Sequence, residues 1–543
     1  MPKAKIMRAL GGELSDEFDY VVAGGGSAGC VVASRLSEDP RVSVCLLEAG
    51  GNGDSWVVTM PFGIAVMLPT PINNWAFHTV PQPGLNGRRG YQPRGKALGG
   101  SSAINAMIYI RGHRWDYDHW ASLGNSGWSY AEVLPYFKRS ENNETIHNEF
   151  HGLGGPLNVC NLTTPNPFQQ RFFDACRQIQ LPSTEDFNGE RQEGAGTFQV
   201  TQQNGERCSA ARAYIHPHLD RPNLRVITGA RATRVLLAGK RATGVEYKIG
   251  RERKTIAARS EVIVSAGTLQ SPQLLMLSGI GVGADLRRFD IDVVHELPGV
   301  GRNLQDHIDY SFIFRSEDQD LLGLSWPGVA RLVREVDRYR RERRGMMTTN
   351  FAECGAFLKT GSELPAPDVQ VQLVVALADN HSRTRHLGHG FTCHVCLLRP
   401  KSRGLVTLQS PDPAAAPLID PRFFDDPDDL ETMVKGFKLT RQILDAPALA
   451  AVRTGDLYAG HVHTDEEIRR SLRERCDTIY HPVGTCKMGT DAQAVVDPQL
   501  RVRGVEALRV ADASIMPTLV GGNTNAPSIM IGEKAADLIR ARS

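Results

Sequence analysis

The chain has 543 residues, more than the roughly 250 to 300 at which a single hydrophobic core stops growing, so two or more compact units are expected. Its 41% hydrophobic and 22% charged residues are typical of a globular protein and exclude a disordered, collagen-like or membrane-spanning class. The 62 basic and 60 acidic residues leave a net charge of +2, which gives no general attraction to nucleic acid, so no nucleic-acid partner is expected.

The cysteines and the apolar segments of the sequence indicate in which cellular compartment the protein works. Ten scattered cysteines argue against a disulfide scaffold and suit a reducing cytosol. Cys393 and Cys396 form one CxxC without a second pair at metal spacing, and the apolar run 391–398 around them predicts a buried strand, so no metal site is expected. The start of the chain lacks the apolar core of a secretory signal, and no run of 18 uncharged apolar residues occurs. We therefore expect a cytoplasmic protein without a transmembrane helix.

A strand, a glycine turn, a helix and a second strand are predicted near the N-terminus. Apolar residues 18–22 and 42–47 predict the two strands, and the small and aliphatic residues 28–36 predict the helix. Together they form a βαβ unit.

The turn of this unit has the GxGxxG spacing. Gly24, Gly26 and Gly29 would allow a tight turn, close approach of the backbone to a pyrophosphate, and close packing of helix on strand. Glu48 ends the second strand, 19 residues after Gly29, where a carboxylate accepts both hydroxyls of an adenosine ribose. The pattern predicts a dinucleotide without a 2′-phosphate, but NAD and FAD share it.

Two further glycine-containing segments follow. Residues 94–105, RGKALGGSSAIN, hold three glycines beside two serines, a stretch whose backbone can approach a flat or phosphorylated ligand closely. Residues 267–281 predict a turn, a helix starting near Pro272 and a glycine-capped end. In the middle of the chain, the alternation in 368–375 and the apolar run 391–398 predict strands of a mostly antiparallel sheet.

In this order, the motifs resemble those of the glucose-methanol-choline (GMC) family of FAD-dependent oxidoreductases, over nearly the whole chain. The segments that carry the resemblance are 95–118, 267–281, 299–307 (GVGRNLQDH), 480–489 (YHPVGTCKMG) and 510–539. Within the family, the sequence is most similar to bacterial dehydrogenases of aliphatic alcohols or polyethylene glycols, with choline dehydrogenase a near neighbour.

The resemblance implies an α/β, Rossmann-like FAD-binding domain and a discontinuous α+β substrate-binding lobe built on a mostly antiparallel sheet. The domain division that it implies assigns 1–155, 211–310 and 475–543 to the FAD-binding domain, and 156–210 and 311–474 to the substrate-binding domain.

It also implies which residues hold FAD. The expected cofactor-binding residues are Gly24, Gly26, Ser27, Ala28, Gly29, Glu48, Ala49, Leu98, Gly99, Gly100, Ser101, Asn105, Ala106, Met107, Ile108, Ala232, Asp512, Ala513 and Pro527. Members with covalently bound FAD carry a histidine directly before the asparagine of the second glycine motif. Here Ile104 precedes Asn105, so noncovalent FAD is expected.

The last segment predicts a helix that Pro527 can open, with Ile529, Met530, Ala535 and Ile539 on a buried face. Its positive N-terminal end could face the flavin N1 and C2 carbonyl and stabilise the charge of the reduced ring.

Alcohol oxidation requires a base for the hydroxyl proton and an acceptor for the hydride. Histidine has a suitable pKa, but with 16 histidines the residue type alone selects none. The resemblance maps the active-site histidine onto His481 and its partner, histidine or asparagine in the family, onto Asn525. Asn525 would donate to the substrate oxygen while His481 accepts the proton. From the residues alone, the run GGNTN is equally typical of a turn.

The function implied is FAD-dependent oxidation of primary alcohols to aldehydes, with hydride transfer to flavin N5 and electrons passed to a quinone or another carrier. Three alternatives stay open at this point: a choline dehydrogenase, an alcohol oxidase that releases hydrogen peroxide, and a lyase that retains FAD.

Residues 326–345 predict a basic amphipathic helix. Its apolar stripe consists of Val329, Leu332, Val333, Val336 and Tyr339. Seven arginines against three acids lie between 331 and 344. One interpretation is a helix packed on the protein with a solvated arginine face; the other is peripheral binding to an anionic inner membrane, where a quinone would be reached.

Overall fold

The computed structural model describes residues 16–541 and their side chains, except those of Trp326, Pro327 and Val329. The start of the chain, on which the expectation about a secretory signal falls, lies outside the described residues. Within residues 16–541, no helix has both the length and the apolar character needed to cross a bilayer. The same residues include no cluster of three or more His, Cys, Asp or Glu side chains arranged to hold a metal ion.

The predicted βαβ unit is confirmed. Strand β1 (Glu17–Ala23), helix α1 (Ser27–Leu36) and strand β2 (Val44–Glu48) follow one another. The two strands pair in parallel, with Tyr20 opposite Val44. Both strands lie between packed layers, which explains their nearly continuous apolar sequence.

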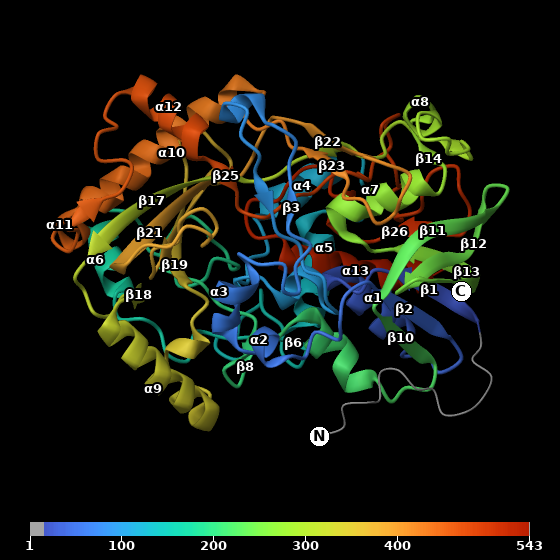
Figure 1. Cartoon of the computed structure of the whole chain (residues 1–543), viewed down its shortest axis with the longest axis horizontal. Coiled ribbons are helices and arrows are strands. Elements are labelled where there is room, and N and C mark those ends of the chain that lie inside the picture. The colour runs from blue at the N-terminus through green and yellow to red at the C-terminus, as the bar shows by residue number, and fades with distance from the viewer. Residues whose placement is uncertain (1–15, 542–543) are drawn as a thin grey trace.

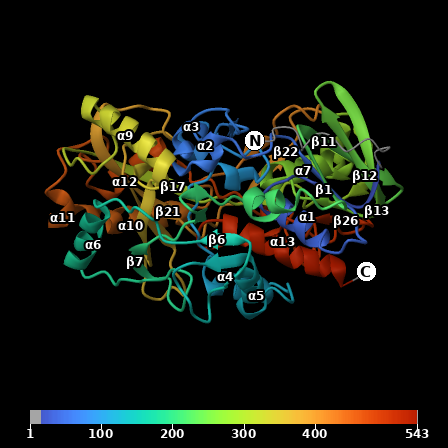
Figure 2. The ribbon, with the colours of Figure 1, turned by 90° about the horizontal axis from the view of Figure 1, so that it is seen from below.

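Distant segments complete this sheet, which lies on the right of Figure 1. Its order is β10-β2-β1-β13-β12-β11, and β26 also pairs with β13. The added strands are β10 (Leu224–Thr228), β11 (Ala230–Ala238), β12 (Arg241–Ile249), β13 (Glu252–Val264) and β26 (Leu508–Val510). Helix α1 contacts α13 (Asn525–Arg540), and α7 (Gly267–Leu277) contacts β11, so the last helix of the chain lies beside the first (Figure 2).

A second, eight-stranded sheet occupies the other half of the molecule. Its order is β24-β17-β21-β20-β19-β7, with β18 paired to β21 and β25 to β17, and all these pairings are antiparallel. The strands are β7 (Gly194–Thr197), β17 (Ile308–Ser316), β18 (Gly323–Leu324), β19 (Ala352–Leu358), β20 (Val369–Val374), β21 (Gly388–Leu397), β24 (Gly455–Asp456) and β25 (Asp477–Thr478). The predicted fold class is thus confirmed, and Cys393 and Cys396 lie buried in strand β21 as expected.

The boundaries of the predicted domains stay a prediction, but two elements cross them. Strand β17 begins at Ile308, before the boundary at 310/311, and β25 lies in the segment 475–543 although it pairs with β17. Both strands lie next to residues of the site described below: His307 directly precedes β17, and His481 follows β25.

Helix α7 begins earlier than expected. It starts at Gly267 and not near Pro272, which lies inside it. Proline lacks the N–H that would bond to the carbonyl of Thr268. The hydroxyl of Thr485 donates to this carbonyl instead, at 2.5 Å, so the helix continues through the proline without an orphaned acceptor.

The amphipathic helix is confirmed as α9 (Trp326–Glu342), and of the two interpretations left open for its apolar stripe, the structure has the stripe packed on the protein. Leu332, Val336 and Tyr339 belong to a hydrophobic cluster inside the protein, because a helix at the edge of the molecule must cover its own apolar face. Val333 alone of the described stripe points outward, at 65% exposure, and the side chain of Val329 lies outside the described residues.

Candidate active site

The glycine turn after β1 is held against neighbouring backbone. A Cβ on Gly24, which has φ +114°, would lie 2.4 Å from the carbonyl oxygen of Ser265. A Cβ on Gly29 would lie 1.9 Å from the carbonyl oxygen of Gly24. No larger residue fits at either position without moving the backbone. The GxGxxG spacing therefore reflects close approach of backbone atoms, as expected.

Glu48 stands at the end of β2, beside this turn. Its carboxylate accepts hydrogen bonds from the backbone N–H groups of Gly50 (2.6 Å) and Gly25 (3.0 Å). Burial raises the pKa of Glu48 to about 7, and these hydrogen bonds act in the opposite direction. Each oxygen keeps a free lone pair, so the carboxylate can still accept hydroxyl groups.

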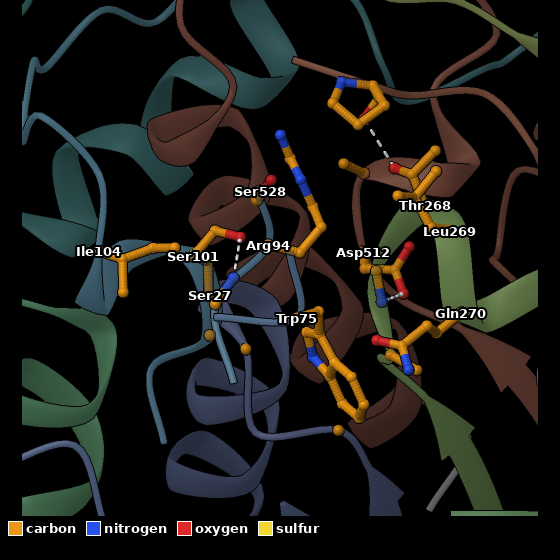
Figure 3. A pocket seen from close by; sticks show the side chains of 18 of the residues that line it. Ser27, Trp75, Arg94, Ser101, Ile104, Thr268, Leu269, Gln270, Asp512 and Ser528 are labelled. Carbon is orange, nitrogen blue, oxygen red and sulfur yellow. Dashed lines mark hydrogen bonds between the residues drawn. The ribbon is translucent and has the colours of Figure 1, made fainter. Parts of the chain in front are cut away.

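A cavity of about 300 Å³ extends from Glu48 to His481. Most of the expected cofactor-binding residues line it, namely Gly24, Gly26, Ser27, Ala28, Glu48, Ala49, Gly100, Ser101, Asn105, Ala106, Met107, Ile108, Ala232, Asp512 and Ala513. Ser27, Ser101 and Asp512 are labelled in Figure 3. Segments from residue 24 to residue 513 thus meet at one site.

Four expected residues do not line the cavity. Gly29 packs on Gly24, and Leu98 and Gly99 support the first glycine turn, with the N–H of Gly99 donating to the carbonyl of Gly25 at 2.7 Å. Pro527 is buried in the first turn of α13. These four residues therefore support the cavity wall and would not contact a molecule bound in the cavity.

The N-terminus of α13 points into the cavity. Thr524, its N-cap, makes no side-chain hydrogen bond to the helix, and Thr524, Asn525 and Ser528 line the cavity. The uncapped N–H groups and the helix dipole make this end positive. Asp512 instead uses its carboxylate inside the protein, accepting from the N–H of Gly267 at 2.9 Å.

His481 lies 7% exposed at the other end of the cavity. Its backbone N–H donates to the carboxylate of Asp306 at 2.9 Å, and its Nδ1 lies 2.9 Å from Nδ1 of His307. Burial lowers the pKa of His481 well below 6.5, and electrostatic interactions with His307 and Arg94 act in the same direction. His481 is therefore a neutral imidazole at physiological pH and can accept a proton.

The predicted partner of His481 needs a correction. The side-chain Nδ2 of Asn523, not of Asn525, lies 3.1 Å from Nε2 of His481. The carbonyl of the Asn525 side chain accepts a hydrogen bond from Ser27 Oγ at 2.7 Å. The reason is the start of α13: Asn525 is its first residue and bonds to the first residue of α1, whereas Asn523 precedes the N-cap Thr524 and faces His481. Asn523 Oδ1 is buried and has no hydrogen-bond partner in the described part of the chain.

Sequence reasoning also missed Arg94, whose guanidinium extends into the cavity in Figure 3. Its Nε and Nη2 are buried without a hydrogen-bond partner among residues 16–541. Burial lowers the pKa of Arg94 to about 10, opposed by Asp306, so the group stays cationic. Its position directly before the glycine motif 95–100 could have indicated a place in the site. A single arginine in a loop, however, is usually exposed to solvent.

A second cavity of about 700 Å³ adjoins the first and shares with it Ile64, Leu68, Ala106, Gln372, Ile479 and Tyr480. Two of its carboxylates have histidine partners: Asp309 bonds to His394 at 2.6 Å, and Asp477 to His381 at 2.9 Å. This chamber gives space for a second molecule next to His481.

Over residues 18–309 and 400–532 the sequence matches the two domains of the GMC oxidoreductase family. The chain is a GMC oxidoreductase. This GMC oxidoreductase is 45% identical over 526 residues to an alcohol dehydrogenase [acceptor] of Pseudomonas putida, covering 96% of this chain and 95% of the relative. It is 44% identical to the mitochondrial choline dehydrogenase of Mus musculus, covering 99% and 92%.

Among solved structures, a formate oxidase variant of Aspergillus oryzae RIB40, studied for its FAD modification, superposes with a TM-score of 0.90. It is 28% identical, and the match covers 97% of this chain and 98% of that one.

The family binds FAD, and the cavity of this GMC oxidoreductase fits this cofactor. The glycine turn and the N-terminus of α13 have N–H groups that would bind the phosphates and the flavin ring. Glu48 has free lone pairs for hydroxyl groups, and Arg94 has donors without a partner.

We expect the FAD to be noncovalent at the second glycine motif. Ile104, buried in the cavity wall, has no atom that can form a bond to the flavin. Acid precipitation of the purified protein should leave the flavin in the supernatant. A covalently flavinylated protein treated in parallel is the control, and yellow colour retained in the washed pellet would contradict the expectation.

Proposed function

We propose that this enzyme oxidises uncharged primary alcohols to aldehydes, with His481 as the base. The observation that carries the proposal is one cavity in which a buried, neutral histidine and the amide of Asn523 face the residues that would hold FAD.

The groups around His481 suit proton removal from an alcohol. Nε2 of His481 would accept the hydroxyl proton while the amide of Asn523 donates to the substrate oxygen. The positive charge of Arg94 in the same cavity would stabilise the negative charge that develops on this oxygen. Bound FAD supplies the hydride acceptor. The alcohol loses one proton and one hydride and leaves as an aldehyde.

Two covered aromatic rings in the adjoining chamber support an uncharged substrate over choline. Recognition of a quaternary ammonium typically uses open aromatic faces. Here the ring of Tyr458 is covered by the guanidinium of Arg475 at 3.3 Å, and that of Tyr91 by Arg383 at 4.7 Å. The partners of Asp309 and Asp477 further reduce the attraction for a cation.

Anaerobic flavin reduction tests this assignment. Octanol should bleach the flavin absorbance faster than choline at equal concentration, with aromatic alcohols and polyethylene glycols measured beside them. Faster reduction by choline would overturn the substrate assignment. No bleaching by any alcohol would overturn the redox function and favour a lyase, since a lyase does not reduce its flavin.

We further propose that the electrons pass to a quinone or another carrier rather than to oxygen. The Pseudomonas putida relative is an alcohol dehydrogenase [acceptor], which supports an electron acceptor as the second substrate. Stoichiometric hydrogen peroxide from air-saturated turnover would contradict this and favour an oxidase.

We also propose that the enzyme is cytoplasmic and binds peripherally to the inner membrane through residues 326–345. The arginines of this segment, rather than its apolar stripe, would make the contact with anionic lipids. Arg341 pairs with Asp337 and Arg343 with Glu206, whereas the exposed Arg334, Arg340 and Arg344 have no ion pair within residues 16–541. Attraction to anionic lipid is worth about 1 kcal/mol per basic residue near the surface and is screened by salt.

The variant Arg340→Gln, Arg341→Gln, Arg343→Gln and Arg344→Gln should sediment less with vesicles containing anionic phosphatidylglycerol at low salt. A matched control removes the same charge from the opposite end of the molecule (Figure 1), at Arg234, Arg241, Arg253 and Arg288. Equal sedimentation of the two variants and the parent would remove this segment as the contact.

A further inference from the structure

A chain of hydrogen bonds leads from Leu398, just after β21, through two buried histidines to Asn523. Nε2 of His307 lies 3.0 Å from the carbonyl oxygen of Leu398. Nδ1 of His307 lies 2.9 Å from Nδ1 of His481, with the two rings almost perpendicular at 86°. Nε2 of His481 then lies 3.1 Å from Asn523 Nδ2.

The carbonyl of Leu398 fixes the proton of the first ring. A carbonyl can only accept, so Nε2 of His307 must carry the hydrogen of this bond. Burial lowers the pKa of His307 to about 3, and the charge of Arg399 acts in the same direction. A neutral imidazole has a single N–H, so Nδ1 of His307 is left with a lone pair and accepts.

The first ring then determines the second. Since Nδ1 of His307 accepts, Nδ1 of His481 must donate. His481 is neutral as well, because burial lowers its pKa well below 6.5. Its single proton is therefore used at Nδ1, and Nε2, the atom that faces Asn523 and the cavity, has the free lone pair.

We propose that His307 is a positioning residue that holds His481 in the tautomer whose Nε2 can act as the base. The inference rests on the proposed function and adds a residue that was assigned no role. After proton transfer, His481 carries an N–H on both nitrogens, and the lone pair of His307 remains the partner of Nδ1. The His307 ring thus stabilises both protonation states without itself changing charge.

Two variants separate this role from simple packing. His307→Leu removes the acceptor, so nothing holds the proton on Nδ1, and Nε2–H can instead donate to the unpaired carbonyl of Asn523 after its amide turns. His307→Gln keeps one donor for Leu398 and one acceptor for His481, because an amide carries both.

With FAD-loaded protein and octanol, flavin reduction should fall roughly 10- to 1,000-fold in His307→Leu, with unchanged FAD content, and by less than about threefold in His307→Gln. The distribution of one proton between two nitrogens of a neutral ring does not depend on pH. The loss in His307→Leu should therefore be the same factor at every pH above the acid limb, whereas a shifted base pKa would let the rate recover as pH rises.

Nitrogen-15 NMR of the FAD-bound protein with labelled histidine rings gives a readout that does not need turnover. The His481 resonances, assigned by their loss in His481→Ala, should show a protonated Nδ1 and an unprotonated Nε2 in the parent, and the reverse in His307→Leu. A protonated Nε2 in the parent overturns the inference, and so does equal loss of rate in the Leu and Gln variants. Parental reduction in His481→Ala would instead overturn the proposed base and leave the NMR result to decide the tautomer.

Discussion

Replacing His481 by alanine should lower the rate of flavin reduction by about 10² to 10⁴, because a positioned base typically contributes that factor. The FAD content should stay near the parental level, since the residues that would hold the phosphates and the adenosine lie at the other end of the cavity. Stopped-flow reduction by octanol without oxygen measures the first quantity, and the ratio of flavin to protein absorbance measures the second.

The pH profile adds a second check on the same residue. Because burial lowers the pKa of His481 well below 6.5, the imidazole is already unprotonated through the ordinary histidine range. The parental reduction rate should therefore be flat through that range and fall only on the acid side, as Nε2 becomes protonated. A parental rate in His481→Ala, or an acid limb centred above 6.5, would show that another group takes the proton.

Replacing Asn523 by alanine should lower the reduction rate by about 10- to 100-fold, because its amide is the donor next to His481 Nε2. Asn525→Ala is the matched control, two residues away and of the same type. It removes the hydrogen bond to Ser27 instead, so we expect a rate within about threefold of the parent and, at most, weaker retention of FAD.

Stopped-flow reduction of the two variants, each with its flavin content, separates these roles. The reverse order, a large loss in Asn525→Ala and none in Asn523→Ala, would restore the pairing expected from the sequence. The comparison is informative because both side chains lie in the same cavity wall and neither change alters charge.

The nucleotide end of the site follows from local sequence. The carbonyl beside Gly24 belongs to Ser265, just after β13, but Gly29 is constrained by the carbonyl of Gly24 in the same turn, and Glu48 stands where its own strand ends. Such relations depend on turn, strand and helix geometry over about thirty residues, and the GxGxxG spacing records them directly.

The catalytic end does not follow in this way. His481 was found because its segment is similar to a family motif, but which asparagine faces it depends on the residue at which α13 begins. A run with asparagine at two alternate positions leaves that choice to the packing of the helix on α1. The sequence therefore predicted the segment, and the structure places Asn523 rather than the expected Asn525 next to His481. The catalytic role of either asparagine stays a prediction.

The amphipathic helix α9 also separates what the sequence predicts from what only the tertiary structure shows. Its length and stripe were predicted from the 3.6-residue period, but the direction of the stripe was not, because periodicity shows that a face must be covered and says nothing of what covers it.

By itself, the sequence determined the βαβ unit and the antiparallel middle segments, since each depends on residues close together in the chain. It also predicted His481 as the proton acceptor, by resemblance to known motifs, and that role stays a proposal. The tertiary structure alone decided that Arg94, His307 and Asn523 surround His481. These residues come from segments up to 429 positions apart, and only the meeting of two sheets brings them within reach of one imidazole, whose tautomer and pKa depend on those neighbours.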